Sequence, residues 1–117
     1  MKIYDYPRID LDRAGTVHQI PARLDWLMLL HLAKAGGWQP VLEGSFEENY
    51  LEPSGGKVSA DDALGIARAL EVILDDIPDF DIAIGSKLHA FEYFSGARKT
   101  QIRNLIVFCK GGAFRIT

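Results

Sequence analysis

Apolar residues recur at helical spacing in three stretches of the chain, residues 22–35, 60–76 and 97–110. Within each stretch they fall three and four positions apart, which predicts a helix with one buried face. A glycine pair directly follows the first and the third stretch, and Pro78 follows the second. These residues end helices, because glycine adopts the left-handed cap geometry easily and proline cannot continue the hydrogen-bond ladder.

Capping residues support the same boundaries. Ser59 precedes the second stretch, and Asp62 stands three residues later, which resembles a capping box with the shorter acid in its third position. Ser95 is placed as an N-cap for the third stretch. Residues 87–94 have room for a further short helix.

Short strands are predicted between and outside the helices. Residues 1–20 alternate loosely and indicate a short strand or an extended arm. Residues 38–58 contain prolines, glycines and aromatic residues, which favour one or two short strands with a hairpin near 52–57. Residues 114–116 predict a terminal strand. We therefore expect an α+β fold, mostly α, with three to four helices and a small antiparallel β component that joins the chain ends or the middle loop.

The composition is that of an ordinary globular domain. The chain has 117 residues, of which 48% are hydrophobic and 25% are charged, and its net charge is −3. This length predicts a single domain over residues 1–117. The small excess of acidic residues disfavours a protein that binds polyanions over its whole surface.

Nothing in the sequence indicates export or a membrane. Cys109 is the single cysteine, so no internal disulfide forms. The N-terminus lacks the apolar run of a signal peptide. The most apolar stretch, residues 24–33, contains Asp25 and is far shorter than the roughly 20 apolar residues that span a bilayer. We therefore expect a cytoplasmic protein with no membrane partner.

Several short segments resemble those of a group of small uncharacterised bacterial proteins. They lie within residues 37–117, and they are Gly37-Trp38-Gln39-Pro40, Ser59-Ala60-Asp61-Asp62-Ala63-Leu64, Leu70-Glu71, Asp76-Ile77-Pro78, Glu92-Tyr93-Phe94-Ser95-Gly96 and Phe108-Cys109-Lys110-Gly111-Gly112-Ala113-Phe114-Arg115-Ile116. The resemblance implies a bacterial origin and a single domain. No activity is established for such proteins, so the resemblance implies no catalytic residue.

The residues that carry most enzyme and metal chemistry lack the spacing that such sites need. Cys109 lies on the apolar face of its expected helix and near the C-terminal end, which predicts an inert buried thiol. The histidines are too far apart in sequence for a zinc motif. The acidic residues around Pro78 lack the pattern of a calcium loop and indicate a solvated helix end; they are Asp75, Asp76, Asp79 and Asp81. We expect no catalytic residue, no metal ligand and no cofactor.

Charge is distributed unevenly along the chain. Residues 59–94 contain eight acidic and two basic residues, whereas residues 95–117 contain five basic residues and no acidic one. Lys99, Arg103 and Lys110 share one face of the last expected helix. Either this face packs beside the acidic helix so that the charges compensate, or it binds an anion or a partner.

By elimination, we expect a small cytoplasmic protein-interaction or regulatory module. Its partner would bind near the C-terminal helix, through Lys99, Arg103 and Lys110, and near the aromatic segment 38–50. Trp38, Phe46 and Tyr50 are the candidate anchors of that segment, although all three are equally suited to cover the core.

Two other classes of function stay open. Nucleic acid or another polyanion would bind through the basic C-terminal helix, with a steep dependence on salt. A small enzyme would need at least two scattered histidines and carboxylates to converge in one pocket. The candidates for such convergence are His18, His31, His89, Glu92 and Asp81. The oligomeric state is left open.

Overall fold

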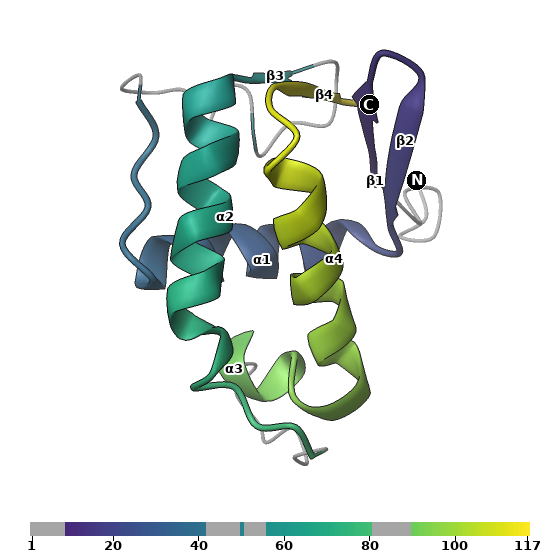
Figure 1. The fold of residues 1–117 in the computed structure, drawn as a ribbon. Helices are drawn as coiled ribbons and strands as arrows, with labels where there is room; N and C mark the ends of the chain where they lie inside the picture. The colour runs from purple at the N-terminus through teal and green to yellow at the C-terminus, as the bar shows by residue number, and fades with distance from the viewer. Residues whose placement is uncertain (1–8, 42–49, 51–55, 81–89) are drawn as a thin grey trace.

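The computed structural model describes residues 9–41, 50, 56–80 and 90–117. Within them the elements follow in the order β1 (Ile9–Arg13), β2 (Thr16–Ile20), α1 (Arg23–Ala35), β3 (Lys57–Val58), α2 (Ala60–Leu74), α3 (Ala90–Tyr93), the 3₁₀ helix η3 (Gly96–Arg98), α4 (Lys99–Cys109) and β4 (Phe114–Ile116) (Figure 1). The fold is α+β and mostly α, as predicted. No helix of the described residues is long and apolar enough to cross a membrane.

The first two strands form a tight hairpin, which corrects the expectation of one short strand or an extended arm. Arg13 is opposite Thr16, so only Ala14 and Gly15 make the turn. Both have positive φ angles, 50° and 93°, as a type I′ turn requires. The first turn residue is usually asparagine or aspartate, because alanine rarely adopts this conformation. With Ala14 in that place, the sequence carries no clear signal for the turn. Residues 1–8 lie outside the described part.

Strand β4 lies in the middle of a four-stranded antiparallel sheet with the order β2-β1-β4-β3. Leu11 of β1 is opposite Ile116, and Val58 of β3 is opposite Phe114. The sheet thus joins both ends of the sequence and its middle. Of the hairpin expected near residues 52–57, residues 51–55 lie outside the described part, and Lys57 pairs with β4 instead.

Helices α1 and α4 each contact β2, and α2 packs against both of these helices. In Figure 1, α2 and α4 lie side by side and α1 crosses behind them. Apolar side chains from the helices and the inner sheet face form the core, among them Leu11, Trp26, Leu29, Ile66, Leu70, Ile102, Leu105, Phe114 and Ile116. Burying each large side chain contributes roughly 1.5–3 kcal/mol.

The two expected N-caps behave differently. Ser59 caps α2, because its hydroxyl accepts a hydrogen bond of 3.1 Å from the backbone N–H of Asp62. Ser95 makes no side-chain cap, and its hydroxyl donates instead to the carbonyl of Glu92 at 2.7 Å. The last helix therefore begins with the 3₁₀ turn η3 before α4.

Where α1 ends, its backbone lies directly against α2. A Cβ atom at Gly36 would lie 2.2 Å from the carbonyl oxygen of Ala69. Glycine is required here for this close approach of the two backbones. The contact fixes the turn after α1, including Gly37 and Trp38, against the side of α2.

Candidate functional site

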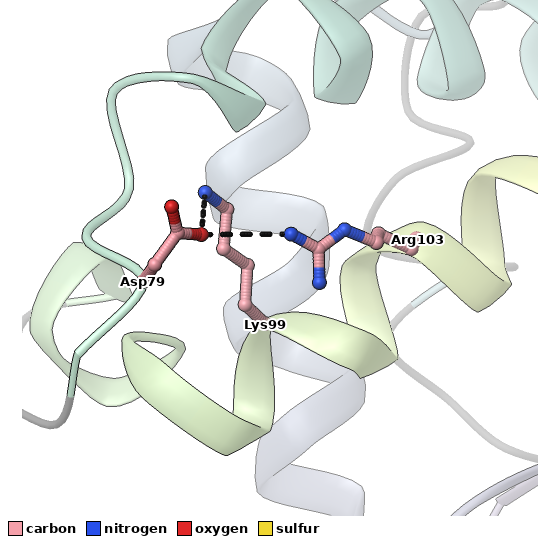
Figure 2. A network of polar contacts seen from close by, with 3 residues as sticks. All are labelled: Asp79, Lys99 and Arg103. Carbon is pink, nitrogen blue, oxygen red and sulfur yellow. Dashed lines mark hydrogen bonds and ion pairs between the residues drawn. The ribbon is translucent and has the colours of Figure 1, made fainter.

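The basic face of α4 lies against acidic residues of α2 and of the segment that follows α2. The Lys99 ammonium lies 2.8 Å from Asp79 Oδ1, and Arg103 Nη2 lies 3.5 Å from the same oxygen (Figure 2). Lys110 Nζ lies 3.0 Å from Glu71 Oε2. The three candidate partner-binding cations are therefore all paired within the fold, as the first of the two interpretations requires.

Lys99 differs from the other two cations because its side chain is buried. Its stem lies in the protein and its ammonium reaches the exposed carboxylate of Asp79. The hydrogen bond and the charge of Lys99 lower the pKa of Asp79 below its usual value. Arg103 and Lys110 keep about half of their side chains exposed. Only these two cations of the expected face are within reach of a ligand.

The start of the last helix also carries Arg98, a cation where the helix dipole disfavours one. The guanidinium of Arg98 lies 5.0 Å from the centre of the Tyr93 ring, an attractive cation–π arrangement. The Tyr93 hydroxyl donates to the carboxylate of Asp25, which is buried. Burial, followed by this hydrogen bond, raises the pKa of Tyr93 to about 12. The tertiary contacts of Arg98 and Lys99 thus account for their positions.

The aromatic candidates of segment 38–50 face inwards where they are described. Trp38 and Tyr50 are buried, and their rings stack with centres 5.9 Å apart. Both donate to the buried carboxylate of Asp62, from Trp38 Nε1 at 3.2 Å and from the Tyr50 hydroxyl. In this position both rings cover the core, and Trp38 also contributes to the lining of a groove. Phe46 lies outside the described residues.

A groove opens beside Trp38, between α2 and the turn that follows α1. It encloses about 300 Å³, and we call it the α2 groove; its lining includes Gly36, Trp38, Val41, Gly65, Arg68 and Val72. The Val41 side chain is 60% exposed and that of Val72 is 69% exposed. Arg68 is exposed and forms no ion pair with another described residue. The α2 groove therefore combines an apolar rim with three charged residues, Arg68, Asp61 and Asp62.

A second groove, of about 680 Å³, lies at the end of the sheet next to the hairpin turn. We call it the sheet groove; its lining includes Asp12, Ala14, Lys57, Ala113, Phe114 and Arg115. Neither Lys57 nor Arg115 is among the candidate binding residues expected from the sequence. They are 58 positions apart, and only the pairing of β3 with β4 brings them together.

No protein-family model, no curated protein and no solved structure matches this chain. The resemblance to small uncharacterised bacterial proteins stays a prediction. The geometry of the molecule alone therefore carries the interpretation of its surfaces.

The described candidates for an enzyme site do not meet in either groove. His18 stacks on Phe108 with ring centres 5.2 Å apart, and burial lowers the pKa of His18. His18, His31 and Glu92 line neither the α2 groove nor the sheet groove. His89 and Asp81 lie outside the described residues. Within the described part of the chain, no group of three or more potential metal ligands occurs.

The single thiol is unsuited to act as a nucleophile. Cys109 is the last residue of α4 and is buried, and this burial raises the pKa of Cys109 to about 12, although the charge of Arg13 partly opposes the shift. Near neutral pH the thiol is almost entirely protonated, whereas the thiolate is the reactive form.

The sequence contained one signal for the α2 groove. Val72 lies between Glu71 and Ile73, off the apolar face that buries Ile66, Leu70 and Ile73. An exposed valine on the charged side of a helix is a possible contact for another molecule. Val41 gave no comparable signal, because it lies in a loop without periodicity.

Proposed function

We propose that this protein is a protein-interaction module and that its partner docks in the α2 groove. The exposure of Val41 and Val72 on the rim of a concave surface carries this proposal. Apolar side chains around a pocket favour an apolar anchor from a partner, because burial removes both surfaces from water.

The lining of the α2 groove indicates the chemistry of the partner. The two glycines of its base are covered by the fold itself, because Gly36 lies against the backbone of Ala69 and Gly65 lies against the indole of Trp38. The surface that the groove offers to a partner is therefore its apolar rim.

Arg68 forms no ion pair with another described residue, and the carboxylates of Asp61 and Asp62 line the same groove. The partner that fits best is a segment with an apolar anchor that packs against Val41 and Val72.

The basic face of α4 is a weaker candidate for docking. Its cations are already matched by Asp79 and Glu71, so a partner would have to displace these ion pairs. The proposed location is the cytoplasm. The single cysteine supports it, because it is buried and forms no disulfide.

The test compares substitutions inside and outside the groove. We expect Val72→Asp to abolish capture of a stoichiometric partner from a lysate of the source cells, because it places a charge where the apolar anchor would lie. Val107→Asp is the matched control, because Val107 is 73% exposed on α4 and does not line the groove. The wild type and this control should retain the partner equally.

The salt concentration separates this proposal from polyanion binding. Docking through apolar contacts persists at high salt, whereas nucleic acid is released steeply as salt rises. A partner that is retained by Val72→Asp, lost equally with Val107→Asp, or absent from every eluate would contradict the proposal.

A further inference from the structure

Two cations stand directly opposite each other where β3 pairs with β4. Lys57 is the register partner of Arg115, and both side chains are exposed. Like charges in this position destabilise an antiparallel pair. Neither residue forms an ion pair with another described residue. Across this row of the sheet the two cations face a single acid, Asp12 of β1, which is the other register partner of Arg115.

The other charged residues around the sheet groove are already engaged. The Arg13 side chain turns towards the end of α4, where its Nε and Nη2 atoms donate to backbone carbonyls, including that of Gly112 at 2.9 Å. Asp12 is the register partner of Arg115 on the other side. However, Asp12 Oδ1 accepts the backbone N–H of Gly15 at 3.1 Å and so stabilises the hairpin turn. Lys57 and Arg115 form no ion pair with another described residue, and the carboxylate of Asp12 stays beside Arg115 as a negative charge that a ligand must outweigh.

The shape of the sheet groove suits a small organic molecule. Its volume of about 680 Å³ falls within the range of roughly 300–1,000 Å³ that is usual for small-molecule sites. Ala14, Ala113 and Phe114 supply apolar surface next to the two cations. A ligand that complements this lining has an apolar body and an anionic group.

We infer that the sheet groove binds a phosphomonoester, whose phosphate group pairs with both Lys57 and Arg115. A phosphate dianion matches the two positive charges, and the guanidinium of arginine can donate two parallel hydrogen bonds to its oxygens. The apolar body of the ligand lies against Ala14 and Ala113. This inference is independent of the partner proposed for the α2 groove, because the two grooves share no lining residue.

The test is a titration of the full chain with phenyl phosphate in which the amide chemical shifts are measured by NMR. The ionic strength is kept constant, and the pH is about 8, where the phosphate is a dianion. We expect saturable shifts at Lys57, Val58, Phe114 and Arg115. Inorganic phosphate lacks the apolar body and benzoate carries a single charge, so each should bind more weakly than phenyl phosphate. Equal affinity for benzoate would overturn the assignment to a phosphomonoester.

Variants locate the site. Lys57→Gln and Arg115→Gln should each weaken binding about fivefold, the effect of losing one exposed charge pair of about 1 kcal/mol. Asp12→Asn should strengthen binding, because it removes a nearby negative charge and keeps an oxygen for the Gly15 N–H. Arg68→Gln is the matched control, since it removes an exposed cation elsewhere and should leave the affinity unchanged.

The same spectra show whether each variant is folded, because a native pattern of shifts is retained on a surface substitution. The inference is overturned if phenyl phosphate produces no saturable shift in the folded wild type. It is equally overturned if Arg68→Gln weakens binding as much as Lys57→Gln does, because the general field of the protein would then explain the effect.

Discussion

One carboxylate organises the loop that borders the α2 groove. Asp62 accepts hydrogen bonds from Trp38 Nε1 at 3.2 Å, from the backbone N–H of Val41 at 2.9 Å and from the Tyr50 hydroxyl. Burying a carboxylate costs folding free energy unless several donors surround it. The three donors here belong to the segment between α1 and α2. Asp62 therefore fixes the wall and the rim of the groove to the first turn of α2.

Removal of this carboxylate should destabilise the protein strongly. We expect Asp62→Ala to lower the free energy of unfolding by about 3 kcal/mol, because three donors lose a charged acceptor. Tyr50→Phe removes one of these bonds and should cost about 1.5 kcal/mol. Urea denaturation measures both values.

The neighbouring acid provides the control for this experiment. Asp61 is exposed in the same helical turn, so Asp61→Ala loses only its interaction with the helix dipole and should cost about 0.5 kcal/mol. An Asp62→Ala variant as stable as Asp61→Ala would show that the three hydrogen bonds contribute nothing to folding.

At the scale of elements, the hairpin caps the last helix from outside. The Arg13 guanidinium donates to the carbonyls of Phe108, Gly112 and Ala113 at the end of α4, and it lies 4.2 Å from the centre of the Phe108 ring. A cation at this end of a helix is favoured by the dipole, and it satisfies carbonyls that lack helical partners. The link couples β1 to α4 across almost the whole sequence.

The coupling should be visible in the stability of an Arg13 variant. Arg13→Met keeps an apolar stem over Phe108 and removes the donors, and we expect a loss of about 2 kcal/mol from the free energy of unfolding. Arg13→Lys should recover the charge but only part of this loss, because an ammonium cannot reproduce the planar geometry of the guanidinium.

Hydrogen exchange tells this cap apart from a general loss of stability. Relative to the wild type, Arg13→Met should speed up the exchange of the amides in the last turn of α4 and in β4 more than that of the amides in the middle of α2. A uniform change over all helices would contradict a local cap.

At the scale of the whole molecule, ionisation of buried groups limits stability at high pH. Burial raises the pKa of Cys109 from an ordinary value of 9.0 to about 12, and the pKa of Tyr93 rises in the same direction. Between about pH 9 and pH 12 the Cys109 thiol has lost its proton in the unfolded chain but retains it in the folded protein. Stability is therefore fully present below about pH 9 and falls as the pH rises towards 12.

This dependence can be measured with urea at about pH 8 and about pH 10. We expect the wild type to lose stability between the two, and Cys109→Ala to lose less, because the variant lacks the raised thiol. Apart from Cys109 the two proteins carry the same titratable groups, so the difference between their losses reports on the thiol. Equal losses in the two proteins would show that Cys109 does not contribute to the fall.

A structural feature could be predicted from the sequence when the residues that cause it are close together in the chain. The helices and the cap by Ser59 follow from spacing and neighbouring residues, and they were predicted correctly. The hairpin was missed because its turn contains Ala14, which adopts a left-handed conformation only through its surroundings.

The surfaces were less predictable than the elements. The partner of Lys99 is Asp79, twenty positions earlier in the chain, and only the packing of α4 on the end of α2 brings the two together. Lys57 and Arg115 likewise meet only through the register of β3 and β4. Sequence patterns describe one element at a time, whereas these contacts depend on where the elements are placed in space.

The position of β4 in the middle of the sheet has a consequence for synthesis of the protein on the ribosome. Helices α1 and α2 emerge early, but neither β1 nor β3 can complete its pairing until Phe114–Ile116 have left the exit tunnel. Until then the edge of β1 that is not paired with β2 lacks its neighbouring strand. The sheet therefore assembles only after translation of its last strand, and the nascent chain depends until that moment on helical contacts that are local in sequence.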